Sequence, residues 1–272
     1  MAELRLQNHI DRAQTMTSIS LFSESPAESH IQRLAKQGRT RIETIFNPKS
    51  ASLIHAALSQ DTPWHLAYSD DESVARELSP SELAALSEQD HADLLQGVYK
   101  RAGNQYQYVY KFFPIINAIL QNQLNPNSTL YQIATFLNGT EFLKYARQLT
   151  GDHAIVKFNP VATRYDPGHF LNMHDDFGDG RESHSNGQRL YAVVFGFSRD
   201  WASNWGGGTN FFAEADSSWA ETWYPGFNTM TIFKVPALHS VSPVAPFAQA
   251  NRYSITGWLR SDPSIQRPDL AF

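Results

Sequence analysis

The sequence predicts a mainly β fold with flanking helices, in which an antiparallel sandwich or barrel is supported by helices from the N-terminal half. After residue 153, seven short runs rich in β-branched and aromatic residues are separated by Gly, Pro, Asn and Asp. This spacing is typical of all-β domains. The patterns before residue 152 are mainly helical. Because the 272-residue chain has no internal repeat and no separating linker, we expect a single β core.

The N-terminal part contains patterns for a helix and then for a strand followed by a second helix. A helix over residues 26–37 is expected to end at Gly38, because glycine commonly follows the last helical turn. Residues 41–46 alternate in polarity as a strand does. Pro48 is favoured in the first turn of a helix, and the following pattern continues through Leu58. We therefore expect a strand and then a helix here.

Three further helices are predicted before the β region. Residues 79–95 give the strongest signal, because Ser79 can cap the helix, a proline and a glutamate follow in the first turn, and apolar residues recur three and four apart. Helices are also expected over 114–123 and 128–149, the second ending at Gly151. All of these helices are interpreted as packing support for the β core.

The seven predicted strands have short turn-forming segments between them, with one exception. A long polar loop at 177–188 is expected to carry function or to be mobile. The strands are expected within residues 154–161, 169–176, 189–198, 207–214, 228–235, 239–244 and 252–260.

Composition excludes several classes of protein. Lys plus Arg number 22 against 27 Asp plus Glu, a net charge of −5, so no nucleic-acid partner is predicted. The absence of cysteine removes disulfides, thiolate metal sites and a cysteine nucleophile, and any metal site must use His, Asp or Glu. No signal-like or membrane-spanning apolar run occurs. We expect a cytoplasmic protein with no membrane association.

A candidate metal site begins with His174 and Asp176. In a strand their side chains would share one face, while Asp175 would point away. His239, in a later predicted strand, would complete a set of two histidines and one carboxylate. This facial triad is typical of non-haem Fe(II) and leaves coordination positions open for other ligands. His169 is five positions from His174 and is expected to face the other side.

A candidate anion site follows thirteen residues after His239. Arg252 and Ser254 would share one face of a predicted strand with Thr256 and Trp258. A guanidinium held on a strand can bind a carboxylate through two parallel, charge-assisted hydrogen bonds. Arg252 is therefore a candidate for holding the distal carboxylate of a dicarboxylate ligand.

Four segments together resemble the Fe(II)/2-oxoglutarate-dependent oxygenases, specifically the prolyl 4-hydroxylase-like branch and, within it, the ribosomal-protein prolyl hydroxylases. YDPGHFLNMHDD at 165–176 is similar to the family's tyrosine-glycine run and His-Asp-Asp motif, and WGGGTNFF at 205–212 is similar to its Gly-Gly strand. FKVPALH at 233–239 and RYSITGWLR at 252–260 resemble its distal-histidine and arginine strands. The resemblance covers about residues 155–260, because the N-terminal helical part matches only loosely.

The resemblance implies a double-stranded β-helix with helices packed on its major sheet. The expected organisation is an N-terminal arm over 1–40 and one 2-oxoglutarate oxygenase domain over 41–272, with helical support over 41–152 and a catalytic barrel over 153–262. The expected cofactors are Fe(II), the cosubstrate 2-oxoglutarate and O2, with ascorbate as a reductant in the family. The implied activity is hydroxylation of an unactivated C–H bond, with a prolyl residue of a protein or peptide as the partner substrate.

The resemblance also assigns roles by position. His174, Asp176 and His239 would hold the iron, and Arg252 would bind the C5 carboxylate of 2-oxoglutarate with Ser254 near it. Tyr165 matches the family tyrosine whose hydroxyl reaches the cosubstrate. A further family tyrosine is expected late in the strand after the His-Asp-Asp motif, where this sequence has Phe195. Tyr191 lies four residues earlier and is the candidate for supplying that hydroxyl.

Three alternatives stay open at this point. The same scaffold hydroxylates free amino acids and other small molecules, and fold and metal site do not choose among substrates. The same ligands suit zinc, so a cupin-like zinc hydrolase or lyase is a second class, although Arg252 with Ser254 argues against it because a hydrolase needs no clamp for a dicarboxylate. A non-catalytic metal-binding module is a third.

Overall fold

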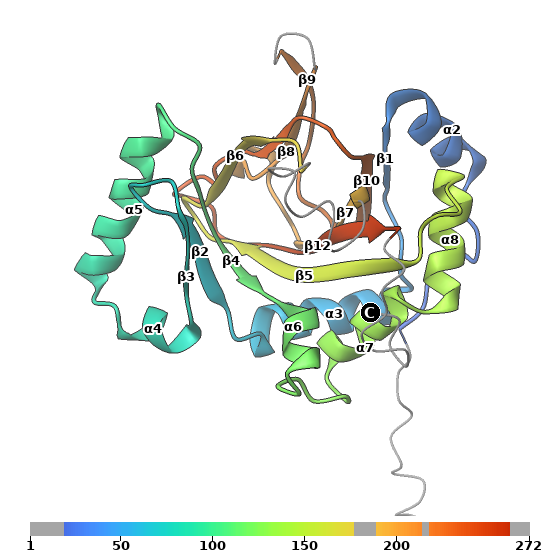
Figure 1. Cartoon of the computed structure of the whole chain (residues 1–272), viewed down its shortest axis with the longest axis horizontal. Helices are drawn as coiled ribbons and strands as arrows, with labels where there is room; N and C mark the ends of the chain where they lie inside the picture. Colours follow the sequence, from blue (N-terminus) through green and yellow to red (C-terminus); the bar gives the residue numbers. More distant parts are fainter. Residues whose placement is uncertain (1–18, 177–188, 214–217, 262–272) are drawn as a thin grey trace, which may run out of the picture.

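The computed structural model describes residues 19–176, 189–213 and 218–261. In these residues the chain forms twelve strands, and all but two of them lie on one continuous path of antiparallel pairing (Figure 1). The strands are β1 Arg39–Ile42, β2 His65–Ser69, β3 Ala75–Leu78, β4 Tyr108–Phe113, β5 Lys157–Tyr165, β6 Phe170–His174, β7 Arg189–Phe197, β8 Thr209–Phe212, β9 Trp219–Trp223, β10 Phe227–Lys234, β11 His239–Val241 and β12 Arg252–Arg260.

The helices precede the long β5 strand in the chain, apart from one short 3-10 turn. They are α2 Glu28–Gln37, α3 Pro48–Ala56, the π-helical turn η1 Ala57–Asp61, α4 Pro80–Ala85, α5 Glu88–Ala102, α6 Ile115–Leu120, α7 Thr129–Leu137, α8 Thr140–Thr150 and the 3-10 turn η2 Ser203–Trp205.

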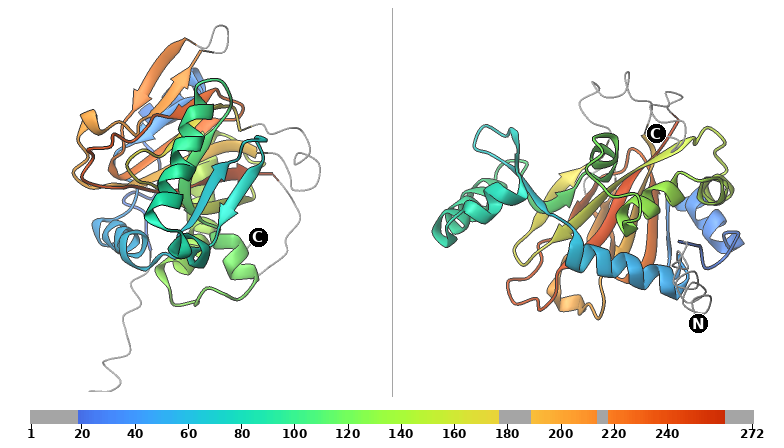
Figure 2. Two further views of the ribbon diagram at one scale, coloured as in Figure 1. Left: turned by 90° about the vertical axis from the view of Figure 1, so that its left-hand side faces the viewer. Right: turned by 90° about the horizontal axis from the view of Figure 1, so that it is seen from below.

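The sheet curls into two facing layers. Its strand order is β1-β10-β7-β12-β5-β4-β6-β11-β8-β9, and the hairpin β2-β3 joins at β4. The first five strands form the major layer, and β6, β11, β8 and β9 form the minor layer, with β4 pairing to both β5 and β6. Figure 2 shows the two layers from the side and from below. This arrangement is a double-stranded β-helix, the fold that the sequence analysis expected.

The largest hydrophobic core lies between the major layer and the helices. Helices α3, α6 and α7 contact β5, β7 or β10, and they lie against the same side of the major layer in Figure 1. At the centre of this core, the Phe195 ring lies 5.4 Å from Phe46, 5.7 Å from Phe142 and 5.9 Å from Phe158. One face of the β7 strand therefore packs against the helices, and the other face points toward the minor layer.

The N-terminal segment also packs on this core. Leu34 of α2 is buried in it together with Ile19 and Leu21, and α2 contacts both β1 and α8. The end of α2 is as predicted, because Gly38 has a φ of 69° and its N–H donates to the carbonyl of Leu34. Residues 19–40 thus cover apolar surface of the β core and its helices.

Two predicted helices are each broken into two. The segment 79–95 contains α4 and α5, because Ser87 caps a second helix and forms a capping box with Asp90. The segment 128–149 contains α7 and α8, separated at Gly139. The predicted end at Gly151 is confirmed, since this residue has a φ of 69° and its N–H donates to the carbonyl of Arg147.

The seven strands predicted after residue 153 are present, while β2, β3, β4 and β9 were not predicted. The strand predicted at 41–46 begins and ends earlier in the structure, where β1 covers Arg39–Ile42. Residue 46 forms an isolated bridge to Leu21 instead. The loop predicted at 177–188 lies outside the described residues. No helix among the described residues is long and apolar enough to cross a bilayer.

Candidate active site

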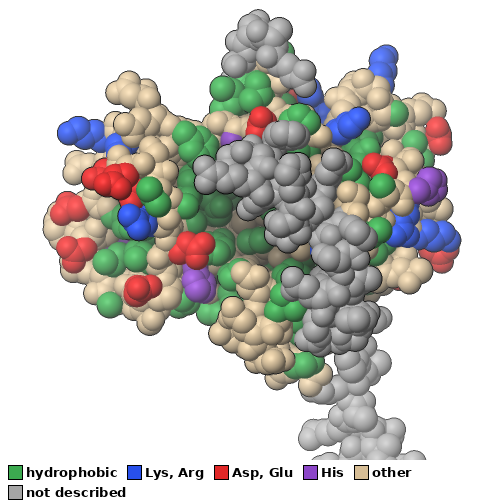
Figure 3. Space-filling view, in the orientation of Figure 1, with side chains coloured by type: hydrophobic (Ala, Val, Ile, Leu, Met, Phe, Trp, Pro, Cys, Tyr) green, Lys and Arg blue, Asp and Glu red, His purple; other side chains and the backbone are tan. Residues whose placement is uncertain are grey.

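A cavity of about 730 Å³ opens between the two layers of the sheet. Most of its lining residues come from β5, β7, β10 and β12 of the major layer, from β6, β8 and β11 of the minor layer, and from β4, which pairs with both layers. The space-filling view shows the hollow near the centre of the molecule, with hydrophobic side chains on its walls (Figure 3). The predicted metal ligands and Arg252 all line this one cavity.

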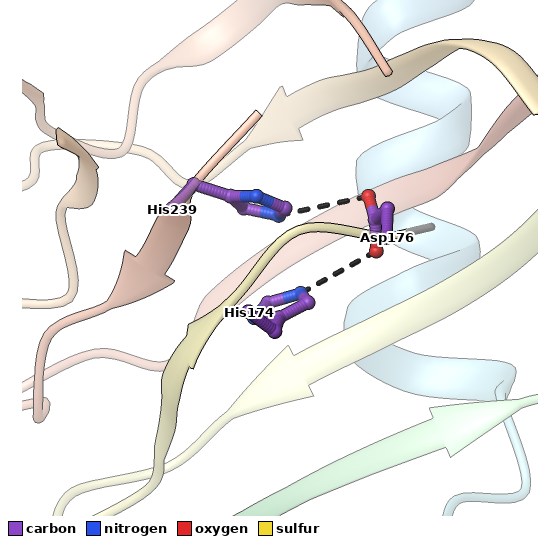
Figure 4. A group of neighbouring side chains, drawn as sticks. All are labelled: His174, Asp176 and His239. Carbon is purple, nitrogen blue, oxygen red and sulfur yellow. Dashed lines mark ion pairs between the residues drawn. The ribbon is translucent and has the colours of Figure 1, made fainter. Parts of the chain in front are cut away.

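The three predicted metal ligands converge there. One ligand atom from each of His174, Asp176 and His239 lies within 4.8 Å of the others. The two carboxylate oxygens of Asp176 are 3.4 Å from His174 Nε2 and 3.6 Å from His239 Nε2 (Figure 4). The imidazole rings have centroids 4.1 Å apart. Two imidazole nitrogens and one carboxylate at a common point form the facial set that suits non-haem Fe(II).

Hydrogen bonds orient both imidazole rings for metal binding. His174 Nδ1 lies 2.9 Å from the carbonyl of Asn172, and His239 Nδ1 lies 2.8 Å from the carbonyl of Ala237. A carbonyl only accepts, so each Nδ1 carries a proton and Nε2 is the ring nitrogen left to bind a metal. Metal-binding histidines are held in this way, with the second ring nitrogen donating to a backbone carbonyl. The residues present therefore fit an iron ion.

The charges of the ligands also suit a cation. Burial opposes the charged form of Asp176, but the hydrogen bond from His174 and the two neighbouring imidazoles outweigh it and lower the pKa of this carboxyl. For His174, burial is outweighed by the hydrogen bond to Asp176, which raises the pKa of the imidazole, so a metal ion would displace a proton from this ring on binding. Burial and the neighbouring His174 lower the pKa of His239 to about 4. His239 is therefore a neutral imidazole at neutral pH, the form that coordinates a metal.

The prediction for Asp175 was wrong. Strand β6 ends at His174, and Asp176 has a φ of 62°. This left-handed backbone breaks the alternation of the strand, so Asp176 reaches the two histidines while Asp175, which was expected to point away, also lines the cavity. The spacing of His174 and Asp176 identified the ligand pair, but a turn and not a continuous strand brings them together.

Arg252 lies at the inner end of the cavity. The residue is 5% exposed, its Nη1 donates to the carbonyl of Gly207 at 2.7 Å, and its Nη2 donates to Thr209 Oγ1 at 3.1 Å. Among the described residues no carboxylate lies within ion-pair distance of it. Burial lowers the pKa of Arg252, but a guanidinium stays protonated in proteins. A buried cation without a counter-charge is costly, and an anionic ligand would relieve that cost.

Tyr165 lines the cavity beside Arg252. Its ring is 5.1 Å from the guanidinium carbon of Arg252, and the two residues are register partners in β5 and β12. Burial raises the pKa of Tyr165 to about 12 against the opposing effect of Arg252, so the hydroxyl keeps its proton and can donate to an anion. Ser254 lies beneath the cavity wall, where its hydroxyl is 2.8 Å from Thr163 Oγ1. Thr163 lines the cavity and Ser254 does not.

Tyr191 is not part of the site. Alternation along β7 turns Ala192 and Val194 toward the cavity, whereas Tyr191, like Phe195, belongs to the core between the major layer and the helices. The interpretation of Tyr191 as the replacement for a missing hydroxyl was therefore wrong. The spacing of four residues placed Tyr191 and Phe195 correctly on one face, but that face is turned away from the ligands.

Sequence reasoning missed the tyrosines of β4. Tyr106, Tyr108 and Tyr110 line the cavity, and the ring of Tyr110 stacks on that of Tyr165 with centroids 5.3 Å apart and planes at 20°. The available signal was the alternation in QYQYVY at 105–110, which places three tyrosines on one face of a strand. Tyr110 thus brings a second phenolic ring to the inner end, where Tyr191 had been expected to act.

Comparison with known proteins agrees with this geometry. Residues 161–260 match the family model of the 2OG-Fe(II) oxygenase superfamily. An oxidoreductase of the 2OG-Fe(II) oxygenase family from Burkholderia pseudomallei has a similar structure, with a TM-score of 0.57 and 14% identity over 88% of this chain and 92% of that one. No curated protein matches the sequence.

A second similar structure is a prolyl hydroxylase from Trichoplax adhaerens, solved in complex with a hypoxia inducible factor oxygen degradation domain peptide fragment. Its TM-score is 0.53 at 14% identity, over 85% of this chain and 87% of that one. At this identity both structures show the shared fold. The family match over residues 161–260 agrees with the resemblance seen in that part of the sequence, and the two solved structures share the fold of the chain.

Proposed function

We propose that the protein is a dioxygenase that hydroxylates an unactivated C–H bond of a prolyl residue in a protein, with His174, Asp176 and His239 holding Fe(II). The observation that carries the proposal is the placement of this ligand set and the buried Arg252 in one cavity. A bound iron ion with 2-oxoglutarate and O2 supplies the oxidising power for such a reaction. The residues of the chain supply binding, orientation and a cavity with apolar walls.

In this proposal Arg252 binds the distal carboxylate of 2-oxoglutarate. Its guanidinium is fixed by Gly207 and Thr209, so the remaining donors have a defined direction, and Tyr165 adds a protonated hydroxyl beside them. Ser254 supports this end indirectly through its hydrogen bond to Thr163. A zinc hydrolase needs no such anion site, which favours the oxygenase among the classes that share these metal ligands.

The apolar side chains around the ligands serve to keep water away from the reacting atoms. Phe233 lies against the His239 ring, with centroids 4.7 Å apart, and Ala192, Val194 and Trp258 line the adjacent wall. Exclusion of water strengthens the charge interactions inside and limits side reactions of an oxidant.

The proposal that the substrate is a protein rests on the size of the cavity and on the resemblance to prolyl hydroxylases. A volume of about 730 Å³ exceeds what a five-carbon dicarboxylate fills and falls in the range of sites for larger ligands. The Trichoplax adhaerens prolyl hydroxylase binds a peptide fragment in the same fold. Ascorbate as a reductant rests on the resemblance alone, and a cytoplasmic location rests on composition alone.

A product assay tests the proposal. The purified protein is incubated in air with Fe(II), 2-oxoglutarate and proline-containing peptides, and succinate is measured together with a mass increase of one oxygen atom on the peptide. We expect both products with Fe(II) and neither with Zn(II) or with His174→Ala. Succinate without peptide oxidation would retain the oxygenase class and contradict the prolyl substrate. No succinate under any of these conditions would contradict the proposed function.

A further inference from the structure

We propose that Tyr106 and Tyr108 form the subsite that holds the prolyl ring of an extended, proline-containing peptide beside the metal ligands. This inference rests on the proposed function and names the residues that would give it substrate specificity. It starts from the tyrosine row, defined as Tyr106, which lies just before β4, together with Tyr108 and Tyr110 of β4; all three line the cavity.

The tyrosine row is continuous from the surface to the anion site. The ring centroids of Tyr106 and Tyr108 are 5.8 Å apart, as are those of Tyr108 and Tyr110. At the inner end Tyr110 stacks on Tyr165, which contacts Arg252. The row therefore connects the mouth of the cavity with the place proposed for 2-oxoglutarate.

The outer part of the row lies beside the metal ligands. The ring of Tyr106 is 6.4 Å from that of His174, yet Tyr106 is 46% exposed. A large aromatic ring left half open at the mouth of a cavity is a typical contact surface for a ligand. Because the inner end is occupied by the proposed cosubstrate interactions, Tyr106 and Tyr108 remain for the substrate.

The chemistry of this wall favours a prolyl ring. Rows of aromatic rings bind proline-rich segments, which already have an extended backbone and lose little conformational entropy on binding. The cavity lining also includes Trp258 and the small residues Ala192 and Val194, so further apolar side chains are available to contact the prolyl ring. Burial, together with the nearby carboxylates of Glu77 and Asp70, raises the pKa of Tyr108. The row is thus uncharged, and the carboxylates disfavour an anionic substrate.

The test measures peptide binding separately from cosubstrate binding. Anaerobic protein loaded with Fe(II) and 2-oxoglutarate is titrated calorimetrically with a short poly-L-proline peptide and with a matched peptide in which alanine replaces proline. The variants are Tyr106→Ala, Tyr108→Ala and the corresponding phenylalanine variants. Tyr224→Ala is the matched control, because Tyr224 is 45% exposed and lies outside the cavity.

We expect the proline peptide, and not the alanine peptide, to bind the wild-type protein. Each alanine variant should weaken that binding by about tenfold, since contact of one aromatic ring contributes on the order of 1 kcal/mol. The phenylalanine variants and the control should bind within about twofold of wild type, because they keep the ring faces. The affinity for 2-oxoglutarate should be unchanged in all variants.

Two outcomes overturn the proposal in distinguishable ways. If 2-oxoglutarate binds but the proline peptide does not, or binds equally to Tyr106→Ala and Tyr108→Ala, the subsite is wrong and the proposed cofactor chemistry stands. If the wild-type protein fails to bind 2-oxoglutarate, the proposed function itself is contradicted, and the subsite with it. Circular dichroism of each alanine variant establishes that the fold is retained.

Discussion

His174 and His239 are register partners across the antiparallel strands β6 and β11, and their rings lie 4.1 Å apart at the centroids. Strand pairing thus fixes the distance between two ligands that are far apart in the sequence. Each ring is held by its own backbone carbonyl, so the ligand set is formed by the protein alone. A site arranged in this way is ready to accept a metal ion without a large rearrangement.

The first prediction concerns iron binding. Asp176→Ala removes the carboxylate that lies between the two imidazoles, and we expect the affinity for Fe(II) to fall by more than about 100-fold, since loss of a direct ligand exceeds the loss seen for supporting residues. The fold should be retained, because removal of Asp176 also relieves a buried charge. Metal content after dialysis against Fe(II) checks this. Asp71→Ala, in the exposed turn between β2 and β3, is the control, and full iron content in Asp176→Ala would contradict the assignment.

A second prediction compares two buried tyrosines. Tyr165→Phe should weaken 2-oxoglutarate binding by roughly fivefold, the effect of losing one hydrogen bond of about 1 kcal/mol. Tyr191→Phe should leave that affinity unchanged, because Tyr191 faces the helices. Calorimetric titration of both variants with 2-oxoglutarate makes the comparison. A larger effect at Tyr191 than at Tyr165 would restore the position that the sequence suggested for the missing hydroxyl.

The difference between the expected and observed sites has a physical origin. His174, Asp176, His239 and Arg252 could be predicted because local strand periodicity and motif spacing identified them. The tyrosine row could not be assigned to the cavity in this way, since β4 joins the cavity wall by pairing with β5 and β6, about 50 and 60 residues later. Local sequence patterns predict which residues lie on the same face of a strand. The pairing of that strand with distant strands determines which other residues this face contacts.

Local sequence patterns also failed to predict where one of the helices ends and the next begins. The apolar periodicity of 79–95 continues across the break between α4 and α5, so it could not reveal the break. The capping box of Ser87 and Asp90 was the local signal for a second start, and it resembles the box of Ser79 and Glu82 that was recognised. Caps therefore deserve as much weight as periodicity when long helices are predicted.

A third prediction concerns stability and pH. Burial lowers the pKa of His169 to about 4, against 6.5 for an ordinary histidine, and its Nδ1 has no hydrogen-bond partner among the described residues. Between pH 4 and pH 6.5 this histidine is protonated in the unfolded chain and neutral in the folded chain. The free energy of unfolding therefore falls as the pH drops from 6.5 to 4, by up to about 3 kcal/mol.

In the variant His169→Phe, the free energy of unfolding should no longer fall with pH on account of residue 169, and only the fall due to the lowered pKa of His239 should remain. Urea unfolding at pH 7 and pH 5 measures the difference in the free energy of unfolding between the two pH values. His153→Gln, at an exposed position, should keep the wild-type difference between the two pH values. An equally steep loss of stability in His169→Phe would show that this residue is not the source.

A fourth prediction tests the support of the barrel by the helices. Phe195 is fully buried and contacts aromatic rings from the helical layer and from β5. Phe195→Ala should lower the free energy of unfolding by about 3–5 kcal/mol. Phe247→Ala, at a position that is 64% exposed, should change it by less than about 0.5 kcal/mol. Equal values for the two variants in urea denaturation would contradict the packing described for β7.

The metal ligands and Arg252 are expected to act together on 2-oxoglutarate, and one measurement tests both. Metal-free protein is titrated anaerobically with Fe(II) and then with 2-oxoglutarate, and the visible charge-transfer absorption of an iron-bound keto acid is followed. We expect the band to appear in the wild-type protein and in the control Arg199→Met, whose side chain lies at an exposed position. Arg252→Met should need about 100-fold more 2-oxoglutarate, because a buried charged contact contributes about 2–5 kcal/mol.

Removal of Arg252 should not lower the stability of the ligand-free protein, since its charge has no acidic partner among the described residues. Thermal unfolding of wild type and Arg252→Met without ligands separates this effect from loss of the fold. The band in the wild-type protein, with its shift to higher 2-oxoglutarate concentration in Arg252→Met, is the result that the account predicts. Iron binding without the band, or a band that does not respond to Arg252→Met, would contradict it.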